Sequence, residues 1–250
     1  ATRQALHEHD AITLPAGEYP VIYGPQAVAE LFQELILPAL CLDTVAAGTS
    51  PFAERFGQTI ASPLLTLSDD GTLPGLIGSH LITGDGIPTG NTPLITSGRL
   101  VGLLANVYHA QALDARFGPL PPHNGMRFAL DHRSFTMRPG IFPTNVLLRS
   151  DAALPLPELL ASIEHGMYIG SLWLTTPEEG LHTGAFRSIV VGPSWHIQHG
   201  ALGRPLQAES LRLEANYVHL LQQITGIATT PQAITFASHK SMMLAPAVRC

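Results

Sequence analysis

Charge of either sign is scarce in this sequence of 250 residues. Only 13% of the residues are charged, with 13 Lys and Arg against 19 Asp and Glu and a formal net charge of −6. Such a chain lacks the basic footprint by which proteins bind nucleic acid. No apolar run approaches the roughly 18 residues of a membrane helix, and the first ten residues do not form a signal peptide. We therefore predict a soluble chain with neither a nucleic-acid nor a membrane partner.

Cysteine is nearly absent. The only two, Cys41 and Cys250, lie far apart in the sequence and give no disulfide framework. This favours a reducing compartment, and we expect the protein in the cytoplasm. Cys41 is flanked by Leu40 and Leu42, a setting that is typical of a buried, protonated thiol rather than a nucleophile.

Apolar residues and turn formers are abundant instead. Hydrophobic residues make up 45% of the chain, and it holds 23 Gly and 21 Pro, which indicates a compact, turn-rich domain. Short apolar runs between Gly and Pro turns predict more strands than helices. The strands expected are 19–23, 62–67, 94–95, 100–104, 145–148, 167–174, 187–191 and 195–198, with 233–236 as the last.

The clearest helix is expected over residues 25–37. Pro25 suits the first helical position, and Pro38 should stop or kink the helix. Five apolar residues recur at helical spacing and predict one buried stripe: Val28, Leu31, Phe32, Leu35 and Ile36. Three further helices are expected at 108–117, from 157 to a C-terminal cap at Gly166, and at 216–225.

Several polar groups are candidates for chemistry, each with a plainer structural interpretation. The segment His7-Glu8-His9-Asp10 could chelate a metal, because alternate residues of an extended segment point the same way. Another group of histidines is dispersed without ligand spacing, and we interpret them as ordinary polar or surface residues: His109, His123, His132, His196 and His199. Asp69-Asp70-Gly71 lacks the pattern of a calcium loop and is interpreted as a structural turn.

Residues 48–75 carry a distinctive succession of motifs. Ser50-Pro51-Phe52, Arg55 and Gly57-Gln58 lead into an expected strand and then into Asp69-Asp70-Gly71-Thr72-Leu73-Pro74-Gly75. This succession resembles the C-terminal domain of the TldD/PmbA (TldE) family. Further similarities, in the family's order, are Leu94-Ile95 with Gly98 and Leu100, Thr144-Asn145-Val146, Glu158 to Gly166, and Thr183 to Arg187.

The resemblance implies a zinc site that this chain has lost. In TldD-like subunits a His-Glu-x-x-x-His helix holds zinc through its two histidines, and the glutamate activates the metal-bound water. The matching positions here are Gln33, Glu34 and Pro38. Both metal ligands are absent, so we expect no zinc and no catalysis in this chain. A cysteine near the C-terminus completes the family's site, but residues 245–249 before Cys250 resemble the ending of non-catalytic TldE-like subunits.

We therefore predict an α+β domain with mainly antiparallel, sandwich- or barrel-like sheet and a few helices, spanning residues 14–250 after a linker or remnant at 1–13. The resemblance implies a non-catalytic TldE-like subunit of a zinc metallopeptidase that acts on small or unfolded peptides. Zinc would sit in a TldD-like partner, although a homodimer is also possible. Arg55 and Asn145 are the candidate substrate contacts. The alternatives are a self-sufficient hydrolase with an unrecognised site and a peptide-binding module without catalysis.

Overall fold

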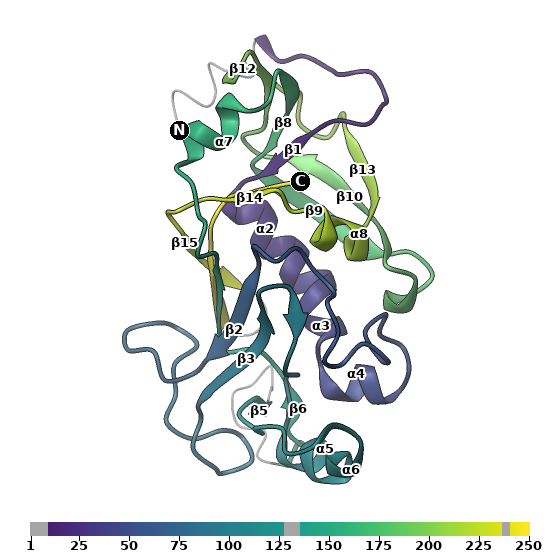
Figure 1. Ribbon diagram of the computed structural model, residues 1–250, viewed down its shortest axis with the longest axis vertical. Coiled ribbons are helices and arrows are strands. Elements are labelled where there is room, and N and C mark those ends of the chain that lie inside the picture. Colours follow the sequence, from purple (N-terminus) through teal and green to yellow (C-terminus); the bar gives the residue numbers. More distant parts are fainter. Residues whose placement is uncertain (1–9, 128–135, 237–240) are drawn as a thin grey trace.

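The computed structural model describes residues 10–127, 136–236 and 241–250, and its sheets surround a central helix (Figure 1). The strands are β1 (Val21–Tyr23), β2 (Thr66–Asp70), β3 (Asn91–Thr96), β4 (Arg99–Leu100), β5 (Gly125–Met126), β6 (Gly140–Ile141), β7 (Asn145–Arg149), β8 (His165–Ile169), β9 (Ser171–Pro177), β10 (Ala185–Val191), β11 (Trp195–Gln198), β12 (Ala201–Pro205), β13 (Arg212–Asn216), β14 (Gly226–Ile227), β15 (Gln232–Phe236), β16 (Ser241–Ala245) and β17 (Val248–Arg249). The helices are α2 (Pro25–Leu31), the π-helix η2 (Phe32–Ile36), α3 (Leu37–Ala39), α4 (Leu42–Ala46), α5 (Val107–Ala112), α6 (Asp114–Phe117), α7 (Leu156–Ala161), the 3₁₀-helix η3 (Leu181–Thr183) and α8 (Tyr217–Gln222).

Four sheets are formed by the described residues. One six-stranded sheet has the order β12-β11-β8-β1-β17-β14, and a second has the order β15-β16-β7-β2-β3-β4. A three-stranded sheet, β13-β10-β9, and a pair, β5-β6, complete the set. Two of the pairings are parallel, β1 with β8 and β16 with β7, and the others are antiparallel. The prediction of an α+β fold with mainly antiparallel sheet is confirmed.

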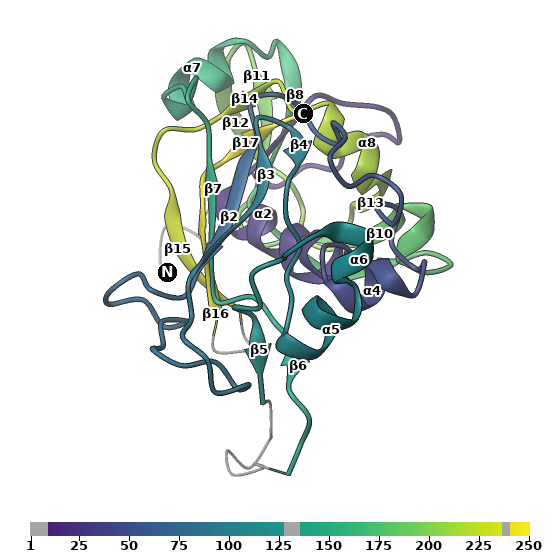
Figure 2. The ribbon, with the colours of Figure 1, turned by 60° about the horizontal axis from the view of Figure 1, so that its bottom comes forward.

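The central helix contacts β1, the strand that precedes it, and packs chiefly against strands of two other sheets. Helix α2 contacts β9 of the three-stranded sheet and β15 and β16 of the second six-stranded sheet. Figure 2 shows α4, α5 and α6 grouped on one side of this helix. The principal core joins apolar side chains of the helix to those of the sheets around it, and a smaller cluster lies beneath α7. Burial of this shared apolar surface is what fixes the helix between the sheets.

Several element boundaries differ from the sequence-based expectations. The strand expected at 62–67 is β2, at 66–70. Gly166 does not cap a helix but lies in β8, where an added Cβ would meet the Pro20 carbonyl oxygen at 2.5 Å. The helix expected at 216–225 is the shorter α8, with the Asn216 side chain capping its first amides. The strand at 233–236 is not the last, because β16 and β17 follow it.

The chain before β1 is partly described. Ile12 forms a parallel bridge with Leu206, and its amide donates to the Pro205 carbonyl at 2.9 Å. The Arg204 guanidinium donates to the Asp10 carbonyl at 3.0 Å. Residues 10–13 are therefore attached to the end of β12, and the domain boundary at residue 14 stays a prediction. None of the helices among the described residues combines the length and apolar character needed to span a bilayer.

Candidate functional site

The helix that matches the family's zinc motif is built as its pattern predicts. Gly24 is the N-cap in extended backbone and Pro25 opens the helix. The predicted apolar stripe is confirmed as fully buried core: Val28, Leu31, Phe32, Leu35 and Ile36. The helical stretch runs through α2, η2 and α3 and ends at Ala39, two residues beyond the expected end.

A π-helical turn interrupts this helix just before Pro38. The Leu37 amide donates to the Phe32 carbonyl, five residues earlier. Pro38 has no amide hydrogen, and its ring would crowd a regular helix; the wider π turn accommodates it. Gln33 lies within this turn and Pro38 just after it, at the two positions that the resemblance assigns to metal ligands.

The donors on this turn do not fit a zinc ion. The Gln33 amide nitrogen donates to Glu34 Oε1 at 2.8 Å, and Glu34 is exposed to solvent. Pro38 carries no ligand atom. Zinc in proteins is held by thiolate, imidazole and carboxylate groups, and this turn offers only one exposed carboxylate. Among the residues that the structure describes, no three His, Cys, Asp or Glu side chains are arranged to hold a metal ion.

Glu30, on the same helix, has a role that the sequence did not indicate. Its carboxylate accepts hydrogen bonds from the Leu172 amide and the Ser171 hydroxyl at the start of β9, and from the Gln26 side chain. Burial raises the pKa of Glu30, and these hydrogen bonds oppose that shift. Glu30 therefore ties the helix to the three-stranded sheet. The signal in the sequence was only a polar residue between apolar ones on the buried side of the helix.

The Ser50-Pro51-Phe52 run packs against the end of the central helix. The Ser50 hydroxyl donates to the Ala39 carbonyl at 2.7 Å and accepts from the Phe52 amide at 3.0 Å. Phe52 is 1% exposed and meets the Tyr217 ring edge-on at 6.4 Å. Arg55, by contrast, is exposed and makes no side-chain hydrogen bond or ion pair with the described residues. The motif thus fixes the helix end and leaves Arg55 free.

Asp69 is not part of an exposed turn, which corrects the interpretation of the acidic pair. It lies in β2, fully buried. Its carboxylate accepts from the Thr144 amide at 2.7 Å, the Thr144 hydroxyl at 2.8 Å and the Asn124 amide group at 2.6 Å. Burial outweighs these bonds and raises the pKa of Asp69 to about 7. Asp70 ends the strand and accepts from the Thr72 amide at 2.8 Å, so the turn itself begins there.

Asn145, the other candidate substrate contact, is also fully buried. Its side-chain oxygen accepts from the Gly78 amide at 3.0 Å, and its nitrogen donates to the Asp70 carbonyl at 2.8 Å and to the Ser79 hydroxyl at 3.1 Å. These three bonds hold the chain that follows β2. Arg55 is exposed whereas Asn145 is buried, and their contact with substrate stays a prediction.

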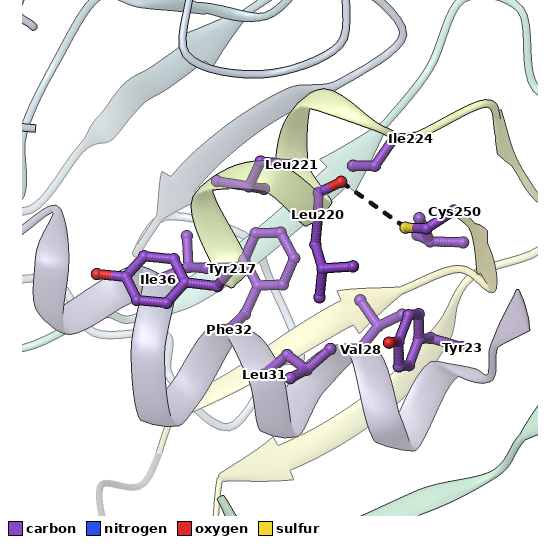
Figure 3. A pocket seen from close by; sticks show the side chains of 11 residues that line it. Tyr23, Val28, Leu31, Phe32, Ile36, Tyr217, Leu220, Leu221, Ile224 and Cys250 are labelled. Carbon is purple, nitrogen blue, oxygen red and sulfur yellow. Dashed lines mark hydrogen bonds between the residues drawn. The ribbon is translucent and has the colours of Figure 1, made fainter. Parts of the chain in front are cut away.

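An apolar crevice lies between the central helix and α8 (Figure 3). It holds about 30 Å³ of free volume, room for little more than one water molecule. Cys250 lines it, and its thiol donates to the Leu220 carbonyl at 3.8 Å. Neither Gln33 nor Pro38 lines it. The crevice is therefore a feature of packing rather than a ligand site.

Both thiols are kept neutral by burial. Burial raises the pKa of Cys250 to about 12. It also raises the pKa of Cys41, which is 8% exposed and donates to the Leu37 carbonyl at 3.4 Å. A thiol that stays protonated is a poor nucleophile.

The histidines within the described residues form surface and half-buried contacts. His199 contacts the Glu164 carboxylate on the surface, and the His165 ring lies 5.7 Å from the His199 ring and 6.1 Å from the His196 ring. His196 is half-buried in β11, and burial together with His165 lowers its pKa. Asn106 caps α5, and its side-chain oxygen accepts from the His109 amide at 2.9 Å and lies 2.9 Å from His109 Nδ1. His7, His9 and His132 lie outside the described residues.

Comparison with known proteins decides the family. The family model described as the PmbA/TldA metallopeptidase C-terminal domain matches residues 16–250. The chain belongs to this family. It is 30% identical over 233 residues to a metalloprotease TldD homolog of Haemophilus influenzae, covering 91% of this chain and 44% of the relative. A metalloprotease of Synechocystis sp. is 28% identical over 223 residues, covering 87% and 44% of the two chains.

A solved structure supports the same fold. The crystal structure of TldE from Thermococcus kodakarensis superposes with a TM-score of 0.82 at 24% identity, over all of this chain and 52% of that one. The chain thus spans less than half the length of the two curated relatives described above. PmbA/TldA membership rests on the family model and on the TldD homolog, and the TldE structure adds the fold.

Proposed function

We propose that this chain is a non-catalytic, TldE-like subunit of a two-chain zinc peptidase, in which a TldD-like partner holds the metal. The observation that carries the proposal is the π turn with Gln33 and Pro38 at the two ligand positions. The helix that elsewhere supports zinc is kept, with its buried stripe and its fixed end, whereas the groups that would bind zinc are missing. Such a pattern is expected when selection retains the architecture of a subunit but not its chemistry.

In this role the chain would form part of the wall around the partner's zinc. The substrates would be small or unfolded peptides in the cytoplasm, and a homodimer is the alternative assembly. Arg55 is the better placed of the two candidate substrate contacts, because its guanidinium is exposed and unpaired among the described residues. A free guanidinium can bind a peptide carboxylate through two parallel hydrogen bonds.

A self-sufficient hydrolase finds less support. Burial holds both thiols neutral, and the buried carboxyl of Asp69 is surrounded by hydrogen-bond donors of the fold rather than facing a pocket. None of these three side chains is both exposed and next to a general base, as nucleophilic catalysis requires.

Co-purification with a relative that carries the His-Glu-x-x-x-His motif tests the proposal. We expect a stable complex whose turnover of unstructured peptides is abolished when the motif glutamate of the relative is replaced by Gln. Glu34→Gln in this chain is the matched control and should leave turnover unchanged. Loss of turnover with Glu34→Gln, or turnover by this chain alone, would contradict the assignment.

A further inference from the structure

Strand β9 exposes two consecutive large apolar side chains. Trp173 and Leu174 are each 56% exposed, although neighbours in a strand normally point to opposite faces. The register with β10 explains this: Trp173 lies opposite Ile189, whereas Thr176 lies opposite Arg187. Strand β9 therefore contains one extra residue, a β-bulge, and Leu174 adopts a left-handed backbone conformation with φ 52°.

This conformation is unfavourable for leucine, and the bulge gives it no interior packing in return. On the inner face the Thr175 and Ser188 hydroxyls form a hydrogen bond at 2.8 Å, and both residues are buried. The extra residue places Leu174 on the outer face, beside Trp173. Bulges at sheet edges commonly re-aim a side chain for a functional contact.

The outer face of the three-stranded sheet is hollowed beside these residues. One hollow of about 400 Å³ is lined by Leu174, Ile189, Arg187 and Arg212 among others. A second hollow of about 540 Å³ also includes Arg187, and the two therefore adjoin along β10. Volumes of this size are typical of ligand pockets. Together they form a trough, which we call the β10 trough.

Charges are distributed unevenly along the β10 trough. Arg187 and Arg212 lie at the hollow beside Leu174 together with Glu214, the cross-strand neighbour of Arg187, whereas Glu178 and Glu179 line the other hollow with Arg187. None of these five side chains forms an ion pair within the part of the chain that the structure describes. The hollow beside Leu174 therefore has a net positive charge and the other hollow a net negative charge, which suits a ligand that carries the complementary charges in order.

The size of the face favours a peptide over a second copy of the chain. A seven-residue strand such as β10 is about 23 Å long, and three strands spaced by roughly 4.8 Å give a face on the order of 300 Å². A stable protein–protein interface buries roughly 800 Å² on each partner. An extended peptide of about five to seven residues, by contrast, matches the length of the strand.

We propose that the β10 trough binds an extended peptide carrying apolar, acidic and basic side chains in that order at alternate positions. The apolar side chain packs on Trp173 and Leu174, the acidic one lies over Arg187, and the basic one reaches Glu178 and Glu179. We place the three side chains of the peptide at alternate positions because this face of β10 presents every second residue, namely Ile189, Arg187 and Ala185. The inference goes beyond the proposed subunit role, since the isolated chain suffices to test it.

The test uses a fluorescein-labelled, end-blocked Leu-Ser-Asp-Ser-Lys peptide and its reversed sequence, because the trough does not fix the chain direction. We expect anisotropy to report saturable binding of at least one of the two. The charge-swapped Leu-Ser-Lys-Ser-Asp peptide and its reverse should bind about tenfold more weakly, because each would place like charges together. Equal affinity of the matched and swapped peptides, or no binding by any of them, would overturn the proposal.

Variants locate the binding on this face. Leu174→Gly removes the apolar side chain at a φ that glycine adopts freely, so the fold is retained, and it should weaken binding about tenfold. Leu81→Ala, at a site 88% exposed on another loop, is the matched control and should have no effect. Unchanged affinity of Leu174→Gly would refute the site. A wild-type dimer that Leu174→Gly converts to a monomer, without peptide binding, would show that a second copy occupies the face.

Discussion

Replacing Asp69 tests the structural role assigned to the buried acidic residue. Asp69→Ala would leave the Thr144 and Asn124 donors without an acceptor in the core. Each unpaired buried donor costs about 1–3 kcal/mol, so we expect Asp69→Ala to lower the free energy of unfolding by about 3 kcal/mol or more. Asp69→Asn should cost less than about 1 kcal/mol. The Asn124 side-chain oxygen is buried without a partner among the described residues. Rotation of the Asn124 amide would turn this oxygen toward the amide introduced at position 69, from which it can accept a hydrogen bond.

The difference in stability between the wild type and Asp69→Asn should also depend on pH, because only the wild type has a titratable group at this position. The pKa of Asp69 is raised to about 7 in the folded protein, against about 3.9 in an unfolded chain. Between these values the folded state holds a proton that the unfolded state has lost, so stability falls as pH rises. The full difference is on the order of 4 kcal/mol. Asp69→Asn lacks this titration, so its stability relative to the wild type should increase as the pH rises.

Urea unfolding of the wild type and Asp69→Asn at about pH 5 and about pH 8 measures this difference. Both proteins share the histidines and the other carboxyl groups, so the effect of these groups on the pH dependence of stability cancels in the comparison. We expect Asp69→Asn to be the less stable protein at the lower pH and to equal or exceed the wild type at the higher pH. A wild type whose advantage over Asp69→Asn grows with pH would show that the hydrogen bonds outweigh burial and that Asp69 is ionised in the native state.

Further predictions concern the central helix. Gln33→His with Pro38→His should not by itself produce a zinc peptidase, because the third ligand and the surrounding walls are also needed; zinc-dependent turnover by the double variant would refute this. Ser50→Ala should lower the free energy of unfolding by about 1–3 kcal/mol in urea titrations, since it breaks the bond to the helix end; an unchanged midpoint would contradict it. Glu30→Ala should cost about 2 kcal/mol by the same assay, and Glu30→Gln, which keeps an acceptor, less; equal losses would show that acceptance of the β9 amide is not the cause.

The sequence predicted those features of the fold that depend on local pattern. The apolar stripe of the central helix has an unambiguous helical period, and Gly24-Pro25 marks its start. The motif at Ser50 and the residues around Asn145 resemble the TldD/PmbA family, and the family model confirms that assignment. These signals are carried by residues close together in the chain, and they need no knowledge of the tertiary structure.

Other features depend on contacts between distant segments. Asp69 follows a strand pattern and precedes a turn signature, so only its pairing with β7 and the Thr144 bonds reveal that it is buried. The strands β16 and β17 have weak patterns, and their partners in the sheets, such as β7 and β1, lie far away in the sequence. The same holds for Glu30, whose partner Leu172 is 142 residues away. The π turn accommodates Pro38, whose ring and missing amide hydrogen do not suit a regular α-helix. The apolar periodicity of the sequence does not predict such a turn.

The zinc content of the purified chain tests the central claim most directly. After removal of any affinity tag and dialysis, elemental analysis of the wild type and of Gln33→Ala should give the same amount, well under one zinc per chain, because Gln33 and Pro38 offer no adequate ligand. Zinc at one equivalent that is lost on changing Gln33, Glu34 or Pro38 would show that this helix binds the metal itself. The chain would then be a catalytic candidate in its own right rather than the partner of one.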